Sequence, residues 1–207
     1  MLLSLIEVIG IPWLVTGTAA AYVCGSVPYG LLLARVFSKQ DVRESGSGNI
    51  GATNVARVAG RRIGVITLGL DALKGAVPVL CCLALPLSAE NQSLLMPWAG
   101  LAAFCGHCYP VWLKFRGGKG VATGLGVLLA LMPIAAAMGF LFFLITYAAS
   151  KYVSLGSLVG TLGVMAGYFS MYRETVDMVP LLVMWCILVW KHRTNLGRLA
   201  RKQEMRV

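Results

Sequence analysis

Continuous apolar stretches of about 20 residues recur along almost the whole chain, and they restrict the fold more than any other feature of the sequence. Residues 125–131 and 181–190, for example, contain no charged side chain. Transmembrane β-strands would instead alternate between apolar and polar residues. Charged residues make up only 13% of the chain, whereas a soluble domain carries about 25%. The sequence therefore predicts an all-α, polytopic integral membrane protein built as a helical bundle.

Six polar or helix-breaking interruptions separate the apolar stretches, and only residues 38–62 form a long one. We expect about seven spans, at residues 11–37, 63–86, 94–113, 120–132, 134–150, 153–171 and 176–190. The 120–132 stretch is too short to cross a ~30 Å core unless the membrane thins there or the segment is re-entrant. Because the sequence contains no internal repeat and no low-complexity linker, residues 1–207 are expected to form one membrane-embedded domain.

Basic residues cluster in alternate interruptions, and this asymmetry predicts the orientation of the chain. The 38–62 segment, the 114–119 turn and the C-terminal tail are rich in lysine and arginine. The opposite set holds the acidic residues Glu7, Glu90, Glu174 and Asp177. The N-terminus is therefore expected outside and the C-terminus in the cytoplasm, which requires an odd number of spans. A break at Pro133 gives seven spans, which fits this orientation, whereas one long helix over 120–150 would give six spans, which does not.

The net charge of +10 is attributed mainly to this topology and not to nucleic-acid binding. The six cysteines lie in apolar stretches, where a free thiol behaves as a small apolar side chain, so no disulfide is expected. The Cys105–Cys108 run lacks a further ligand with suitable spacing, so no metal site is predicted. No basic residue precedes Arg35, and the opening apolar stretch is expected to be a retained helix instead of a cleavable signal peptide.

The long interruption contains the first candidate binding motif, residues 45–54 (SGSGNIGATN) followed by Arg57. Closely spaced glycines allow backbone N–H groups to point at one anion. Ser47, Thr53 and Asn54 add side-chain donors, and the guanidinium of Arg57 matches the geometry of a phosphate group. A plain flexible loop would not require this composition beside an apolar helix. The segment therefore predicts a phosphate-binding site.

The second motif, residues 116–123 (RGGKGVAT), lies at the start of an apolar helix. Its glycines allow close approach, the helix N-terminus favours negative charge, and Lys119 supplies a cation. Leu113 stands where a Walker A loop would have its first glycine, so nucleotide hydrolysis is not implied. The alternative interpretation is a membrane turn with flanking positive charge.

The third motif, residues 191–195 (KHRTN) with Arg198 and Glu204, directly follows the last span. A continuing helix would place His192 and Asn195 on one face, and histidine exchanges a proton near neutral pH. Taken alone, this stretch is also explained by a solvated basic tail.

Several further polar residues lie within or beside the spans. Asp71 and Lys74 are three residues apart, and a structural ion pair is favoured over a proton path. His107 lies near the inner end of the third span and is interpreted as structural. Ser154 and Ser157 follow the inner-face residue Lys151, where helix capping explains them as well as ligand contact does. The three motifs share one membrane face, and together they predict a phosphate-binding pocket at the cytoplasmic lipid interface.

These motifs resemble those of the bacterial acyl-phosphate-dependent glycerol-3-phosphate acyltransferases, the PlsY family. Residues 46–57, 115–123 and 192–204 carry the resemblance, which extends to residues 25–30 and 71–75 and so covers nearly the whole chain. The third motif departs from the pattern at Lys202, where the family usually has glycine.

The resemblance implies transfer of a fatty acyl group from acyl phosphate to the sn-1 hydroxyl of glycerol 3-phosphate, the first acylation step of bacterial phospholipid biosynthesis. The products would be lysophosphatidic acid and phosphate. It further implies an active site on the cytoplasmic face of the bacterial inner membrane, in contact with membrane lipid. A soluble enzyme that supplies acyl phosphate is an expected partner, and neither a cofactor nor nucleic acid is expected.

The residue patterns and the resemblance together give three sets of expected site residues. The resemblance itself implies importance for Ser47 and Arg57, glycerol-phosphate binding around Lys119, activity of His192 and Asn195, and a structural role for Glu204, and the other assignments come from the residue patterns. The catalytic set is Ser47, Arg57, Lys119, His192 and Asn195. The substrate-binding set is Gly48, Asn49, Gly51, Thr53, Asn54, Gly117, Gly118, Gly120, Ser154 and Ser157. Glu204, Asp71, Lys74 and His107 are expected to be structural.

Two chemical routes stay open: Ser47 could carry the acyl group after activation by His192, or the group could pass directly between two positioned substrates. Direct transfer is favoured because acyl phosphate already has a good leaving group, with His192 or a phosphate oxygen of glycerol 3-phosphate as the base. The competing class is a transporter or exchanger of a phosphorylated anion, which would predict midplane polar groups and often an inverted repeat. A purely structural or lipid-binding protein would leave Ser47, Asn54 and His192 unexplained.

Overall fold

The computed structural model describes residues 11–173 and 176–206, so Glu7 and Glu174 of the orientation argument lie outside the described residues. Within these ranges the regular structure is entirely helical, which confirms the all-α prediction. The long helices are α2 (Ile11–Ser26), α5 (Arg61–Cys81), α6 (Ala89–Cys108), α8 (Pro133–Ser150), α9 (Val153–Met171) and α10 (Met178–Lys191). The shorter helices are α3 (Tyr29–Ser38), α4 (Ala52–Ala59), η1 (Cys82–Ala84), η2 (Val111–Leu113), α7 (Val121–Leu131) and α11 (Arg193–Ala200).

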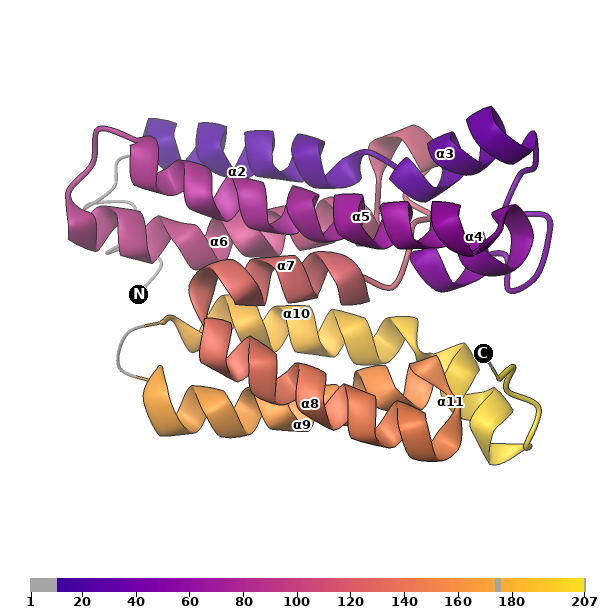
Figure 1. Ribbon diagram of the computed structural model, residues 1–207. Helices are drawn as coiled ribbons and strands as arrows, with labels where there is room; N and C mark the ends of the chain where they lie inside the picture. Colours follow the sequence, from indigo (N-terminus) through magenta and orange to yellow (C-terminus); the bar gives the residue numbers. More distant parts are fainter. Residues whose placement is uncertain (1–10, 174–175, 207) are drawn as a thin grey trace.

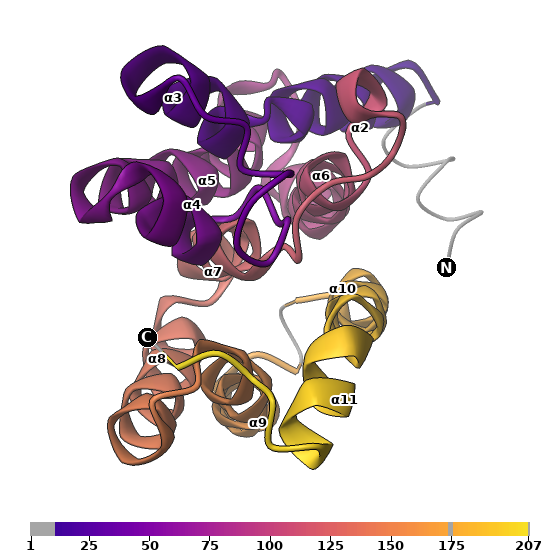
Figure 2. The ribbon, with the colours of Figure 1, turned by 90° about the vertical axis from the view of Figure 1, so that its right-hand side faces the viewer.

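The long helices run roughly along one direction, and the polar connections gather at one end of the bundle (Figure 1). The α3–α4 loop, the segment before α7, and α11 lie at this end together with the C-terminus, while α2 begins at the opposite end. Figure 2 views the polar end and shows two groups of helices, α2 to α7 in one and α8 to α11 in the other. Contacts between α6 and α10 and between α7 and α8 join the two groups.

Among the described residues, four helical segments are long and apolar enough to cross a membrane: Pro12–Ser38, Arg61–Ala84, Pro133–Ser150 and Val153–Met171. The expected spans over 120–132 and 176–190 correspond to the shorter apolar helices α7 and α10. Helix α6 begins five residues before the expected 94–113 span and ends at Cys108, because the residue before Pro110 is disfavoured in a helix. Large apolar side chains such as Ile145 and Leu162, 61% and 56% exposed, cover the outside of the bundle, as a lipid-facing surface requires.

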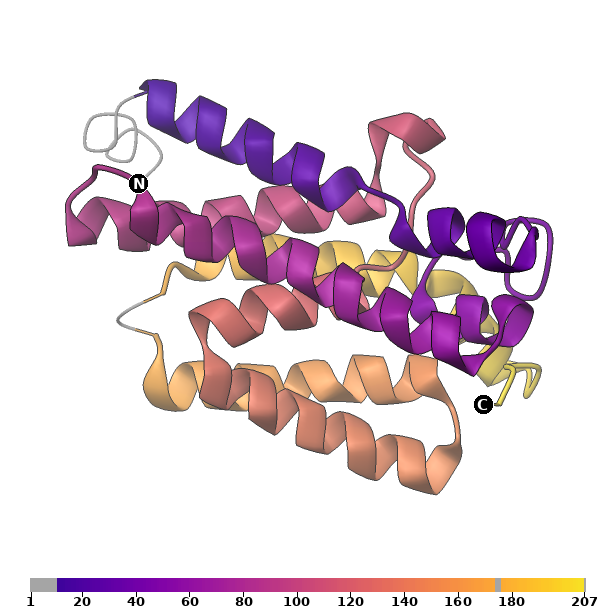
Figure 3. The ribbon, with the colours of Figure 1, turned by 45° about the horizontal axis from the view of Figure 1, so that its top comes forward.

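Proline places two breaks in the helices. Pro28 separates α2 from α3 within the first expected span, and the carbonyl of Val27 accepts a 2.7 Å hydrogen bond from Lys74 Nζ. Pro133 begins α8 directly after the short α7, so the expected break at this residue is present. With 11 residues, α7 is about 16 Å long and ends partway along the bundle (Figure 3). The polar connections are thereby brought to one end, while the chain turns back within the bundle at Met132.

Candidate active site

A cavity of about 730 Å³ lies at the polar end of the bundle and is lined by all three sequence motifs. The first motif contributes Ser47, Asn49, Gly51, Thr53, Asn54 and Arg57. The second contributes Lys119 and Gly120, and the third contributes His192, Asn195, Arg198 and Glu204. Ser154 and Ser157 of α9 also reach the cavity. The structure therefore brings together segments that are more than 150 residues apart in the chain.

Asn54 holds the first motif in shape. Its side chain is 2% exposed, and its Nδ2 donates to the carbonyls of Val42, Ser45 and Asn49 at 2.8–3.1 Å. Its Oδ1 accepts from the backbone N–H of Ser47 at 2.8 Å. Both ends of the amide are therefore engaged in organising the loop, and Gly46 and Gly48 adopt the left-handed φ values of +61° and +68° that this tight path requires.

The N-termini of two helices lie on the cavity wall. Helix α4 begins after Gly51 and α7 begins after Gly120, whose φ of +84° turns the chain into the helix. The first N–H groups of a helix have no intrahelical acceptor, and its dipole favours an anion at that position. A Cβ atom at Gly120 would overlap the ring of Phe104, so the close approach of this turn to α6 requires glycine.

Gly117 and Gly118 lie outside the cavity lining and have a packing role in this structure. Their N–H groups donate to the carbonyls of Cys108 and His107, at 3.2 and 3.1 Å. Side chains at either glycine would overlap α6 or the His107 ring. These two amides are thus engaged by the end of α6, and the adjacent Lys119 is the residue that the turn presents to the cavity.

Cationic side chains dominate the cavity: Arg57, Arg61, Lys119 and Arg198 outnumber Asp71 and Glu204. Burial, and secondarily repulsion by the neighbouring arginines, lowers the pKa of Lys119 to about 8, although Glu204 opposes the shift. Arg61 was missed by the sequence analysis. It follows Gly60, whose φ of +92° bends the chain between α4 and α5 and brings the arginine to the cavity.

His192 lies at the junction of α10 and α11 and is 1% exposed. Its Nδ1 lies 2.8 Å from the carbonyl of Leu188, an acceptor, so Nδ1 carries the hydrogen and Nε2 is left as an acceptor. Burial lowers the pKa of His192 to about 4, and the ring is therefore neutral at pH 7.

Glu204 joins the C-terminal tail to three other segments. One carboxylate oxygen accepts from Ser154 Oγ at 2.8 Å and from Asn195 Nδ2 at 2.5 Å, and the other accepts from Arg198 Nε at 2.7 Å. These hydrogen bonds hold the pKa of Glu204 below its usual value despite the desolvation that opposes them. The tail also reaches the first motif, since the guanidinium of Arg57 donates to the carbonyl of Met205 at 3.4 Å.

Lys202 follows α11 with a φ of +57°, in the left-handed region that favours glycine. Its N–H donates to the carbonyl of Leu199 at 3.0 Å, in the turn that redirects the tail toward Glu204. Glycine adopts this left-handed conformation without strain, which gives a physical reason for the glycine that the family usually has where this chain has Lys202.

A buried polar group forms part of the cavity floor. Asp71 and Lys74 of α5 are paired at 2.8 Å, each with a side chain 2% exposed, and His107 Nδ1 lies 3.7 Å from Asp71 Oδ1. Asp71 and His107 also line the cavity. The sequence predicted a structural role for both residues but not this position on the cavity wall. In the part of the chain that the structure describes, no three His, Cys, Asp or Glu side chains come together as a metal-binding group.

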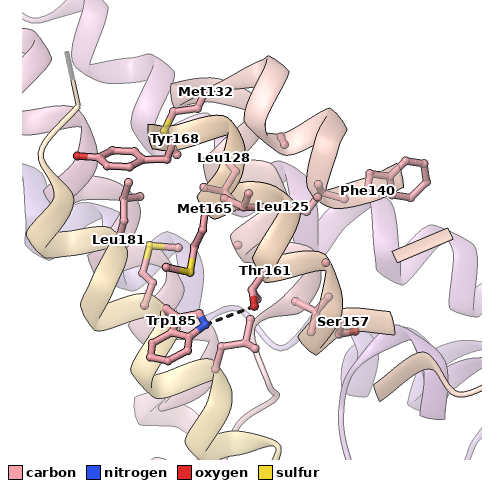
Figure 4. A pocket seen from close by; sticks show the side chains of 18 of the residues that line it. Leu125, Leu128, Met132, Phe140, Ser157, Thr161, Met165, Tyr168, Leu181 and Trp185 are labelled. Carbon is pink, nitrogen blue, oxygen red and sulfur yellow. Dashed lines mark hydrogen bonds between the residues drawn. The ribbon is translucent and has the colours of Figure 1, made fainter. Parts of the chain in front are cut away.

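A second cavity, of about 300 Å³ and almost entirely apolar, lies between α7, α8, α9 and α10 (Figure 4). Met132 and Tyr168 lie at one end in this view and Ser157 near the other, while Trp185 donates a 3.3 Å hydrogen bond to Thr161 across α9 and α10. The two cavities share a set of lining residues: Leu68, Val121, Ala122, Phe143 and Ser157. A cationic polar chamber and an apolar chamber therefore adjoin each other.

Together, fold and site define a helical membrane protein with a cation-rich cavity at one end of its bundle. The family model described as glycerol-3-phosphate acyltransferase matches residues 15–202. The chain belongs to this family and is an acyltransferase, which confirms the resemblance drawn from the motifs.

Bacterial relatives match over almost their full length. The chain is 45% identical over 190 residues to the glycerol-3-phosphate acyltransferase of Anaeromyxobacter sp. strain Fw109-5, covering 91% of this chain and 94% of that one. It is 46% identical over 186 residues to that of Myxococcus xanthus, covering 89% and 95%. A crystal structure of PlsY, an integral membrane glycerol 3-phosphate acyltransferase, in its glycerol 3-phosphate form is similar with a TM-score of 0.83 at 35% identity, covering 94% and 95%. The lysophosphatidic acid form has a TM-score of 0.80, at 35% identity over 93% and 94% of the chains.

Proposed function

We propose that this protein transfers a fatty acyl group from acyl phosphate to the sn-1 hydroxyl of glycerol 3-phosphate at the cytoplasmic face of the bacterial inner membrane. The observation that carries the proposal is the shared wall between the cationic cavity and the apolar chamber. A fatty acyl phosphate has an anionic head and an alkyl chain, and it would occupy both spaces at once. The related crystal structures in glycerol 3-phosphate and lysophosphatidic acid forms support the acceptor and the product.

The anionic groups would bind where the cations and helix N-termini converge. Arg57 and Lys119 would hold the phosphates and stabilise the charge that develops on the acyl carbonyl oxygen. The starts of α4 and α7 add N–H donors from Ala52, Thr53 and Val121. Ser47 would donate its hydroxyl hydrogen to the same anion, as its position on the cavity wall allows.

The transfer itself would be direct. The sn-1 oxygen bonds to the acyl carbon, and the bond from that carbon to the phosphate oxygen breaks, so that phosphate leaves with the electron pair. The hydroxyl proton passes to His192 Nε2 or to a phosphate oxygen of glycerol 3-phosphate. Among the described residues no hydrogen bond joins Ser47 to His192, whose Nδ1 is engaged by a backbone carbonyl instead of a carboxylate. This arrangement supports direct transfer over an acyl-enzyme on Ser47.

The transporter alternative is not favoured. The chain belongs to an acyltransferase family, and its polar lining residues gather at one end of the bundle. Asp71, the acidic member of the buried pair with Lys74 that a transport pathway would use, lines this same cavity at the end of the bundle.

The test is a reaction of the purified protein in detergent with palmitoyl phosphate and glycerol 3-phosphate. We expect lysophosphatidic acid and inorganic phosphate in equal amounts, and no product from palmitoyl-CoA. Arg57→Ala with Lys119→Ala serves as the control, since it removes two cavity cations and should abolish product. Product from palmitoyl-CoA but not from palmitoyl phosphate would show that the proposed donor is wrong.

A further inference from the structure

One histidine ring connects the cavity floor to the second motif. The backbone carbonyl of His107 accepts a hydrogen bond from the N–H of Gly118 at 3.1 Å. The side chain of His107 also lies against this glycine, because its Nε2 occupies the space that a Cβ atom at Gly118 would need. Gly118 directly precedes Lys119, which lines the cavity. The ring therefore limits how closely the turn, and Lys119 with it, can approach α6.

Asp71 holds the opposite edge of this ring. His107 is 4% exposed, and its Nδ1 lies 3.7 Å from Asp71 Oδ1. Nδ1 has no hydrogen-bond partner among the described residues, so electrostatic attraction to the carboxylate orients this edge of the ring. Lys74 fixes the carboxylate in turn, since its Nζ lies 2.8 Å from Asp71 Oδ1 and donates to the carbonyl of Val27 at 2.7 Å. The ring is thus held between a buried ion pair on α5 and the turn before α7.

This geometry does not favour His107 as a catalytic base, because Nδ1 faces Asp71 and Nε2 faces the turn. We propose that Asp71 and His107 are positioning residues: together they set the place of the turn at Gly118, and so the distance between the Lys119 ammonium and the phosphate of glycerol 3-phosphate. This inference rests on the proposed function, in which Lys119 binds that phosphate. The expected consequence of losing either residue is weaker binding of glycerol 3-phosphate.

An exchange of size across the contact between ring and glycine tests the inference. Gly118→Ala places a methyl group against the His107 ring and should displace the turn. The KM for glycerol 3-phosphate should then rise about 10-fold, the lower limit for losing one hydrogen bond to a charged group. His107→Ala removes the support and should raise KM similarly. In the double variant the methyl group fills space that the ring has left, and KM should return close to the wild-type value.

KM is the chosen measurement because it does not depend on the folded fraction of the enzyme. Gly117→Ala is the matched control, since a Cβ atom there would overlap the backbone carbonyl of His107 and not its ring. His107→Ala cannot relieve that overlap, so it should not lower the KM of Gly117→Ala. Asp71→Asn should raise KM in the wild type and leave it unchanged in His107→Ala, because Asp71 acts through the ring.

A second double variant, His107→Asn with Gly118→Ala, covers the case in which His107→Ala does not fold. Asparagine frees the space beside the glycine and keeps an N–H group for Asp71. The inference is overturned if Gly118→Ala leaves KM at the wild-type value, or if neither double variant lowers the KM of Gly118→Ala. It is also overturned if His107→Ala improves Gly117→Ala equally.

The KM comparison requires only that some acyl donor supports acylation of glycerol 3-phosphate. If palmitoyl-CoA supports turnover and palmitoyl phosphate does not, the proposed function fails, while the comparison of variants still decides the role of Asp71 and His107.

Discussion

Ser47 is fixed in the candidate site through its backbone, whose N–H donates to the buried amide of Asn54, while its hydroxyl belongs to the cavity wall. If the hydroxyl donates to a phosphate, Ser47→Ala removes one hydrogen bond to a charged group, worth about 1.5–3 kcal/mol. Activity should then fall roughly 10- to 150-fold and stay measurable. Intact-protein mass spectrometry after mixing with acyl phosphate alone should detect no acylated enzyme. An acyl adduct on Ser47 that forms and discharges at the turnover rate would contradict direct transfer.

Lys119 titrates within an accessible range because burial lowers its pKa to about 8. The cation is present below that pH and is lost above it, so kcat/KM for glycerol 3-phosphate should decline as pH rises through about 8. Lys119→Arg keeps the charge at all working pH values, and its profile should lack this alkaline decline even though its absolute rate is lower. An unchanged decline in the arginine variant would assign the titration to another group.

Lys202 adopts a left-handed φ of +57°, which costs a non-glycine residue about 1–2 kcal/mol. Lys202→Gly should relieve this strain and, after the greater freedom of glycine in the unfolded chain is subtracted, stabilise the protein by about 1 kcal/mol. The thermal midpoint in detergent should rise by about 2–4 °C. Arg201→Gly is the control: its φ of −90° is ordinary, so glycine there should lower the midpoint.

At the scale of elements, the apolar chamber depends on small residues of α7. A Cβ atom added at Gly124 would lie 3.5 Å from Phe104 and 3.9 Å from Met184, which is ordinary contact, so Gly124→Ala should fold while narrowing the chamber. We expect kcat/KM to fall severalfold more for a long-chain acyl phosphate than for a short-chain one. Each methylene of the acyl chain that can no longer be buried costs about 0.8 kcal/mol of binding free energy. Gly69→Ala on α5 meets open space and should leave this preference unchanged. Equal effects of Gly124→Ala on all chain lengths would exclude the chamber as the acyl site.

The elements differ in how far the sequence could predict them. Uninterrupted apolar runs located the long helices, and the proline at 133 predicted the end of α7, because these signals are local. Helix α4 was missed, since its polar, glycine-rich surroundings are typical of a loop. The role of Asn54 depends on three carbonyls that the folded loop brings together, and that of Gly118 depends on contact with His107 of α6. Such roles are set by tertiary contacts, which no local pattern encodes.

For the whole molecule, we propose seven spans with the N-terminus outside and the C-terminus in the cytoplasm. The three motif segments share one end of the bundle, and the α5–α6 connection lies at the other (Figure 1). In a cysteine-free background, single cysteines at the exposed positions Ser45, Arg116 and Thr194 should be protected from an impermeant thiol reagent in intact cells, and one at Glu90 should be labelled. Permeabilised cells provide the control for reactivity. Labelling of the first three positions from outside would reverse the orientation.

The wall shared by the polar cavity and the apolar chamber determines how the reaction rate depends on the concentrations of the two substrates. Under the proposed function, glycerol 3-phosphate arrives from a volume of water, whereas the acyl donor arrives from an area of membrane. Two different units of concentration then govern one reaction: moles per litre for the acceptor, and mole fraction of lipid for the donor. Diluting the membrane with inert lipid at constant volume would lower the occupancy of the apolar chamber by acyl phosphate, while the polar cavity stays saturated with glycerol 3-phosphate. The rate would therefore respond to the composition of the bilayer as directly as to the composition of the cytoplasm.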